Sequence, residues 1–261
     1  MVARSCEFES HPAHKKQKSD ICICICHFFF VILHAKLFLK KIITQWNRIM
    51  RLVFASNNAH KLDEVRAIMP KGIEILSLSK IGFESEIEET GLTLAENSKL
   101  KAEAVESWLI KQGKWNAVDG IFADDTGLEI DALGGEPGVY TGRWAERETG
   151  IHLPEAETYA ANRRKALREL AGKENRGCQF KTVITLITNN KAVVQVEGIV
   201  RGKITSEEHG VGGFGYDPIF IPEGYNATFG ELPAQIKNTI SHRARALAKL
   251  VDVVSLAIRN K

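Results

Sequence analysis

Two adjacent carboxylates near the middle of the chain constrain its fold more than any other feature. The apolar run GIFA at 120–123 leads directly into Asp124 and Asp125, and a Thr-Gly pair follows. We expect a strand that ends at these carboxylates beside a turn, where it could hold a hard cation or a base. Because successive side chains of a strand point to opposite faces, one Asp can face a cleft while the other braces the turn. Taken alone, the stretch is equally compatible with an acidic turn that has no chemistry.

Charge and cysteine are distributed unevenly along the 261 residues. The formal net charge is +3, but residues 50–261 contain 27 Lys or Arg against 29 Asp or Glu. The main part of the chain therefore has no basic excess that would indicate nucleic-acid binding. Four of the five cysteines precede residue 50, which leaves Cys178 alone in the rest. This excludes a disulfide framework there and favours a reducing compartment, so we expect a cytoplasmic protein.

The first 49 residues differ in character from the rest. A polar, basic stretch is followed by an apolar run at 21–33 that His27 interrupts. The run is short for a membrane span and lacks the cleavage site of a signal peptide, so we expect no membrane association. Its CICICH spacing matches no structural zinc pattern. We expect residues 1–49 to be an extension that is disordered or that lies upstream of a true start at Met50. Residues 50–261 are expected to form one folded domain. The intact mass of the native protein tests the start at Met50.

After Met50 the hydrophobic pattern predicts strands and helices in alternation. Strands are expected over 51–56 and 73–78, and helices over 62–69, 94–110 and 154–170. Thr93 and Glu96 form a capping box at the start of the second helix. A long hairpin over 180–204 and a final amphipathic helix complete the pattern.

Two early stretches carry residues that are typical of a phosphate site. The polar loop at 56–61 lies between a strand and a helix, an arrangement that presents backbone N–H groups to an anion. It lacks the spacing of a Walker A motif, and GIVRGK at 198–203 is one residue short of it. Glu88 and Glu89 precede a tight turn, and either could complete a divalent-cation site with the Asp pair. Lys101 could neutralise phosphate. The alternatives are that the 56–61 loop is a turn without a ligand, that Glu88 and Glu89 lie on a solvated acidic face, and that Lys101 is an ordinary surface lysine.

Two late stretches indicate that the protein binds a nucleotide base and an anion. The glycines at 212–215 let the backbone approach a ligand, and the rings of Phe214 or Tyr216 can stack on a base. Packed aromatics in a hairpin loop are the alternative. His242 and Arg243 stand in the expected first turn of the last helix, where each cation opposes the helix dipole by about 0.3–1 kcal/mol. An anionic ligand at this point would remove the conflict.

Together these residues form the inventory of a magnesium-dependent enzyme acting on a nucleotide phosphate chain. Five blocks also resemble, in order, the non-standard purine nucleoside triphosphate pyrophosphatases, the inosine/xanthosine triphosphate pyrophosphatase family. They are SNNAHK, EETG with a following ENSKLKA, ADDTGLEIDALGGEPGVYTGRW, GGFGYDPIF and KNTISHRARAL. The resemblance covers about residues 51–255 and leaves out residues 1–49.

The resemblance implies an α/β fold in which a long mixed β-sheet with flanking helices forms two lobes around a central nucleotide cleft. It implies a homodimer that uses Mg2+ to hydrolyse ITP, dITP and XTP to the monophosphate and pyrophosphate, which keeps these nucleotides out of DNA and RNA. Asp125 resembles the proton acceptor, and Glu88 and Asp125 the metal ligands. The implied substrate-binding residues are Ser56, Asn57, Asn58, Ala59, His60, Lys61, Thr126, Phe214, Gly215, Tyr216, Asp217, Lys237, His242 and Arg243. His60 stands where many members carry Gly or Lys, a departure that we expect to be tolerated.

Base selection would follow from the 6-oxo acceptor of inosine and xanthine. Donors from Lys237 or Arg243 would be left unpaired by adenine, a mismatch that discriminates strongly. Two other interpretations stay open. One is a related pyrophosphatase for other modified nucleotides, which a substrate panel separates; the other is a non-catalytic nucleotide-binding module, which would bind without turnover.

Overall fold

The computed structural model describes residues 49–259, so all but the last residue of the expected extension lies outside the described residues. A seven-stranded sheet with the strand order β2-β1-β3-β5-β6-β7, and with β4 beside β3, organises this part of the chain. The strands are β1 (Met50–Phe54), β2 (Ile73–Leu76), β3 (Gly120–Ile130), β4 (Pro137–Gly138), β5 (Gly177–Thr188), β6 (Val193–Ile204) and β7 (Phe220–Pro222). β1 pairs in parallel with β2 and β3, and the other pairs are antiparallel, which makes the sheet mixed as expected.

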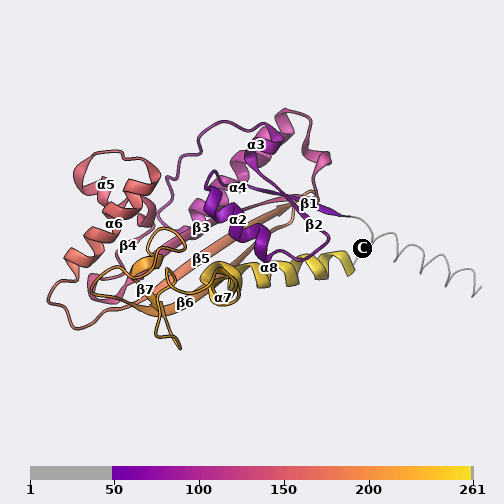
Figure 1. The fold of residues 1–261 in the computed structure, drawn as a ribbon. Coiled ribbons are helices and arrows are strands. Elements are labelled where there is room, and N and C mark those ends of the chain that lie inside the picture. The colour runs from indigo at the N-terminus through magenta and orange to yellow at the C-terminus, as the bar shows by residue number, and fades with distance from the viewer. Residues whose placement is uncertain (1–48, 260–261) are drawn as a thin grey trace, which may run out of the picture. The chain divides into compact units, whose positions relative to one another are not determined.

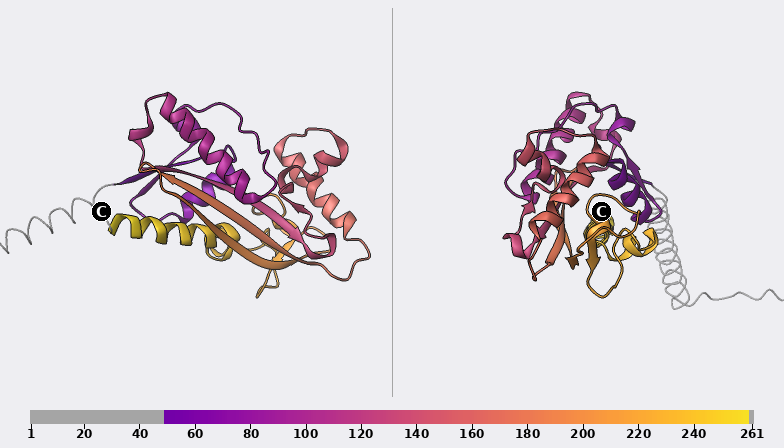
Figure 2. Two further views of the ribbon diagram at one scale, coloured as in Figure 1. Left: turned by 180° about the vertical axis from the view of Figure 1, so that it is seen from behind. Right: turned by 60° about the vertical axis from the view of Figure 1, so that its left-hand side comes forward.

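Helices cover both faces of the sheet. They are α2 (Ala59–Ile68), α3 (Leu78–Ile81), α4 (Leu94–Lys111), α5 (Trp144–Thr149), α6 (Glu155–Glu169), α7 (Ala234–Ile240) and α8 (His242–Arg259). α4 lies on one face and α8 on the other, while α5 and α6 gather at one end of the long strands (Figures 1 and 2). Ile121 packs in the cluster on the α4 side, and its neighbour Phe122 packs with Leu247 of α8. None of the helices within residues 49–259 is both long and apolar enough to cross a bilayer.

β3 differs from its prediction in length. We expected the strand to end at the Asp pair, but it continues to Ile130, and Thr126 and Gly127 form no turn. β5 is the reason, because its residues pair with β3 over the whole length from Gly120 to Ile130. The predicted alternation is confirmed by the contacts of the two carboxylates, since Asp124 meets Arg243 of α8 and Asp125 meets Lys101 of α4.

Several predicted elements are confirmed. The capping box of α4 is present, with reciprocal hydrogen bonds between Thr93 and Glu96. The hairpin of β5 and β6 is likewise as expected. The final helix is divided, however: α7 carries Lys237, and α8 begins at His242. Ser241 separates them and caps α8, because its Oγ accepts a hydrogen bond from the N–H of Ala244 at 3.1 Å.

Candidate active site

A cleft of about 720 Å3 collects most of the predicted site residues. Its lining includes Ser56, Asn57, Asn58, Lys61, Asp125, Thr126, Phe214, Gly215, Tyr216, Asp217, Lys237, His242 and Arg243. Ala59, His60 and Glu88 are predicted site residues that do not line it. The cleft therefore brings together the loop before α2, the middle of β3, the 212–217 loop and the start of α8.

Asp124 lies on the α8 side of the sheet and is 1% exposed. Its Oδ1 accepts from Lys61 Nζ and its Oδ2 from Arg243 Nε, both at 3.0 Å. Burial raises the pKa of this carboxyl, but the two cations outweigh burial and hold the pKa well below its usual range. Asp124 is thus a permanent anion that fixes two cationic side chains at the floor of the cleft.

Asp125 lies on the other face in a different environment. Lys101 Nζ donates to its Oδ1 at 2.9 Å and to Glu89 Oε1 at 3.0 Å, and Asn97 Nδ2 lies 3.4 Å from its Oδ2. Burial, which Lys101 offsets only in part, raises the pKa of Asp125. A raised pKa makes a carboxylate a stronger proton acceptor, which suits Asp125 to general-base chemistry.

Lys101 keeps its charge in this cluster. Burial lowers the pKa of its ammonium, but Asp125 and Glu89 more than compensate and raise it. For Glu89 the balance is similar: burial raises its pKa, and Lys101 outweighs burial and lowers it. Lys101, Glu89 and Asp125 therefore form a charged cluster that can meet both a cation and a phosphate.

The structure places Glu89, and not Glu88, beside Asp125. Glu88 is exposed, whereas Glu89 lines the cleft and also accepts from Arg143 Nη1 at 3.2 Å. Of the two carboxylates expected before the turn, Glu89 is therefore the one that shares Lys101 with Asp125. Within residues 49–259 no group of three or more His, Cys, Asp or Glu side chains could hold a metal. Two carboxylates still suit Mg2+, which keeps several waters and takes its other ligands from substrate phosphates.

Lys237 and Arg243 are joined by a carboxylate that the sequence pattern did not indicate. Glu64 of α2 accepts from Lys237 Nζ at 2.6 Å and from Arg243 Nη1. Asp217 accepts from Lys237 as well, and Asp124 from Arg243. The anion expected at the start of the last helix is thus supplied by the protein itself, so the dipole conflict does not by itself indicate a ligand.

The aromatic residues of the 212–217 loop divide between the core and the cleft. Tyr216 is 4% exposed, and its hydroxyl donates to the Thr141 carbonyl at 3.1 Å, so it belongs to the core. Phe214 is half-buried in the cleft, with Lys237 Nζ 4.7 Å from the centre of its ring. His60 stacks on Phe214 with ring centres 5.2 Å apart, so this departure from the family pattern touches the predicted base platform.

His242 lines the same cleft and has an unused polar atom. The residue is 4% exposed and stacks on Phe180, with ring centres 4.7 Å apart. Its Nδ1 is buried and has no hydrogen-bond partner in the described part of the chain. Burial, together with the charges of Arg243 and Lys237, lowers the pKa of the imidazole well below its usual value. His242 is therefore neutral and can supply one hydrogen bond to a ligand.

The loop before α2 lines the same cleft with Ser56, Asn57 and Asn58. Asn58 caps the helix, because its Oδ1 accepts from the N–H of Lys61 at 3.0 Å. Its Nδ2 donates to Glu155 Oε1 and Tyr159 Oη, each at 2.8 Å, so the side-chain amide is fully engaged. The first N–H groups of a helix have no partner within the helix, which leaves those of Ala59 and His60 available for an anion.

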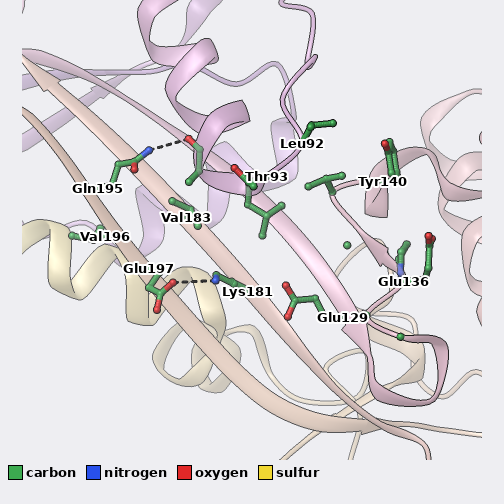
Figure 3. Close-up of a pocket in the computed structure, with 17 residues that line it drawn as sticks. Leu92, Thr93, Glu129, Glu136, Tyr140, Lys181, Val183, Gln195, Val196 and Glu197 are labelled. Atoms are coloured by element: carbon green, nitrogen blue, oxygen red, sulfur yellow. Dashed lines mark hydrogen bonds and ion pairs between the residues drawn. The ribbon is translucent and has the colours of Figure 1, made fainter.

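A second cavity, of about 640 Å3, lies against β5, β6 and the loop before β4 (Figure 3). Three of its charged side chains have partners: Lys181 pairs with Glu197 at 3.2 Å, and Glu129 accepts from Gln179, outside the lining, at 2.6 Å. It contains none of the predicted site residues. We assign no chemistry to this cavity.

Sequence reasoning missed several residues of the cleft. Glu64 follows Lys61 by three positions on α2, a spacing that puts both side chains on one helix face and could have indicated it. Arg143 lies within the family-like block at 123–144. Glu155 and Tyr159 of α6 had no comparable signal, because that helix showed only an ordinary acidic start and an apolar pattern.

Comparisons with known proteins agree with this geometry. The model of the Ham1 family matches residues 52–253. The chain is 45% identical to a dITP/XTP pyrophosphatase of Flavobacterium johnsoniae, over 79% of this chain and 98% of the relative, and 43% identical to that of Bacillus subtilis, over 76% and 93%. Among solved structures, the HAM1 protein of Coxiella burnetii matches with a TM-score of 0.66 and 34% identity, over 79% of this chain and 98% of that chain. The Ham1 protein of Staphylococcus aureus matches with a TM-score of 0.65 and 34% identity, over 78% and 98%.

Proposed function

The chain belongs to the Ham1 family, and from that premise we propose that it hydrolyses non-standard purine nucleoside triphosphates and so cleanses the nucleotide pool. Its substrates would be ITP, dITP and XTP, and its products the monophosphate and pyrophosphate. One observation carries the proposal beyond the names of relatives: a single cleft is lined both by the Glu89–Lys101–Asp125 cluster and by the aromatic and cationic residues around Phe214.

In this proposal Asp125 accepts a proton from the water that attacks the α-phosphorus. Its raised pKa favours that role, and the hydrogen bond from Lys101 fixes the orientation of its carboxylate. Lys101 can also donate to the phosphate chain, because an ammonium has three N–H donors and the two carboxylates use two of them. The backbone N–H groups at the start of α2 hold the rest of the chain in line for attack.

Glu89 and Asp125 would hold Mg2+ together with the phosphates of the substrate. The ion would supply a positive charge that offsets the negative charge developing on the departing pyrophosphate. Arg143, which donates to both the side chain and the carbonyl of Glu89 at 3.2 Å, keeps that carboxylate turned toward Lys101.

Base selection is assigned to Lys237 and His242. Glu64 and Asp217 use two of the three donors of Lys237, which leaves one for the 6-oxo group of hypoxanthine or xanthine. The unpaired Nδ1 of His242 offers a second hydrogen bond. Arg243 is 1% exposed and tied to Asp124 and Glu64, so we assign it the role of a brace. Adenine would leave a buried donor unpaired, which costs binding free energy.

A homodimer, on the family resemblance, and a cytoplasmic location, on the single cysteine after residue 50, complete the proposal. Size-exclusion chromatography with light scattering tests the first. A monomeric mass at micromolar concentration would contradict it.

A substrate panel tests the proposed function. We expect pyrophosphate from ITP, dITP and XTP in the presence of magnesium, and much slower release from ATP and dTTP. Lys237→Met should reduce the ratio of kcat/KM for ITP to that for ATP by about tenfold or more. Lys181→Met, in the second cavity, is the matched control and should leave the ratio unchanged. Equal turnover of all the nucleotides, or binding without turnover, would contradict the proposal.

A further inference from the structure

A stripe of three side chains on α6 joins the two ends of the cleft. Glu155, Tyr159 and Arg163 are spaced four residues apart, so they lie on one face of the helix. α6 is remote in sequence from the loop before α2 and from the 212–217 loop. The helix face with these three side chains nevertheless contacts both loops.

The contact with the first loop runs through Asn58. Tyr159 Oη accepts a hydrogen bond from Asn58 Nδ2 at 2.8 Å and donates its own proton to Glu155 Oε1. Glu155 Oε1 also accepts from the same Asn58 nitrogen at 2.8 Å. Because Asn58 Oδ1 caps α2, this three-residue network fixes the start of the helix, where the first N–H groups have no partner within the helix.

The contact with the second loop runs through an aromatic ring and a carbonyl. The ring of Tyr159 lies 6.0 Å from that of Phe214 and 6.4 Å from that of His60. One turn further along α6, Arg163 Nη1 donates to the Gly215 carbonyl at 2.9 Å, and its Nε lies 2.9 Å from Glu208. Tyr159 therefore contacts both the residue that caps the anion-facing helix and the ring that is proposed to stack on the base.

From these contacts we infer that Tyr159 is a positioning residue that couples the phosphate end of the cleft to the base end. This inference rests on the proposed function, which assigns those ends to phosphate and base. An occupied base end holds Phe214 in place, Phe214 holds the Tyr159 ring, and the Tyr159 hydroxyl holds Asn58 and the start of α2. Binding at either end therefore orders the other, and the two fragments of a nucleotide bind with positive cooperativity.

The test measures that cooperativity with separate fragments. Calorimetry gives the Kd of inosine for the full chain, with and without saturating magnesium pyrophosphate. We expect pyrophosphate to tighten inosine binding by about fivefold or more in the wild type. Tyr159→Phe keeps the ring and removes the hydroxyl, and it should lower that factor by about twofold or more, although the stacking of His60 on Phe214 remains. Glu155→Gln keeps the acceptor and should retain the factor, whereas Glu155→Ala should lower it.

Controls separate coupling from a merely structural role. Tyr225→Phe removes a hydroxyl outside the cleft and should keep the full factor. Thermal unfolding of each variant shows whether the fold is intact. An unchanged factor in Tyr159→Phe, or no cooperativity in the wild type, would overturn the inference. ITP turnover by the wild type is measured on the same preparation. No turnover would contradict the proposed function. Turnover by the wild type together with an unchanged cooperativity factor in Tyr159→Phe would contradict the inference alone.

Discussion

At the scale of single residues, two neighbouring Asp side chains have opposite properties because a strand sends them to opposite faces. Asp124 meets two cations, which lower its pKa despite complete burial. Asp125 shares one cation with Glu89, and burial raises its pKa. The first is therefore suited to bracing and the second to accepting a proton.

Matched Asn variants test this division. Asp124→Asn leaves Lys61 and Arg243 without their common anion, and we expect a loss of about 3–5 kcal/mol in the free energy of unfolding. Asp125→Asn removes a carboxylate whose ionised form burial disfavours and leaves Lys101 paired with Glu89, so this variant should lose less stability than Asp124→Asn. Its kcat for ITP should nevertheless fall by about 10²–10⁴. Chemical denaturation and steady-state kinetics on both variants check the result, and the reverse pattern would refute the assignment.

Glu64 gives a prediction about pH. Burial raises its pKa, but Arg243 and Lys237 outweigh burial and lower it below the ordinary value of 4.5. The folded state then binds fewer protons than the unfolded state, so the contribution of Glu64 is complete above about pH 5 and is lost as the pH falls through the folded pKa. The free energy of unfolding should fall less steeply with acid in Glu64→Gln than in the wild type. Parallel curves would contradict this role.

At the scale of elements, the start of α8 depends on a glycine in β6. A Cβ on Gly198 would overlap the carbonyl oxygen of His242 and the backbone nitrogen of Ala246. A Cβ on the nearby Gly202 would likewise overlap the carbonyl oxygen of Ile221 and the ring of Phe220. The two glycines of GIVRGK thus allow neighbouring backbone and side chains to pack closely against β6. This packing role explains why the segment contains the glycines of a phosphate loop without being one.

Gly198→Ala should therefore damage both stability and binding. Because backbone atoms of α8 must shift, we expect a loss of about 1–3 kcal/mol or more in the free energy of unfolding. The shift also moves His242 and Arg243, so the KM for ITP should rise in the protein that remains folded. Val193→Ala, at an exposed position of the same strand, is the control and should change neither quantity appreciably. An Ala variant with wild-type stability would show that α8 does not depend on this contact.

Much of this architecture could be predicted because it depends on local pattern. The capping box at Thr93 and the alternation of Asp124 and Asp125 follow from neighbouring residues, and both are confirmed. The end of β3 could not be predicted, because it depends on the pairing of Ile130 with Cys178 of β5, 48 positions further along the chain. The same applies to Glu64, whose partner Arg243 lies 179 positions further along the chain. Local sequence does not encode which distant cation a buried carboxylate meets.

At the scale of the whole molecule, the proposed function assigns reaction to the Glu89–Lys101–Asp125 cluster and recognition to the residues around Phe214. Within residues 49–259 this cluster offers two carboxylates to a metal, so the ion would be retained largely by substrate phosphates. We expect chelation with EDTA to abolish ITP turnover and added magnesium to restore it. The thermal midpoint of the nucleotide-free protein should change little. A large drop in that midpoint on chelation would instead indicate a structural metal.

The central claim is that Asp125 directs water to the α-phosphorus, and hydrolysis of ITP in oxygen-18 water tests it most directly. Mass spectrometry of the products locates the new oxygen. The account predicts one labelled oxygen in IMP and none in pyrophosphate, with turnover nearly absent in Asp125→Asn. Label in pyrophosphate would place the attack at the β-phosphorus, and labelled free phosphate would place it at the γ-phosphorus. Either result would contradict the account.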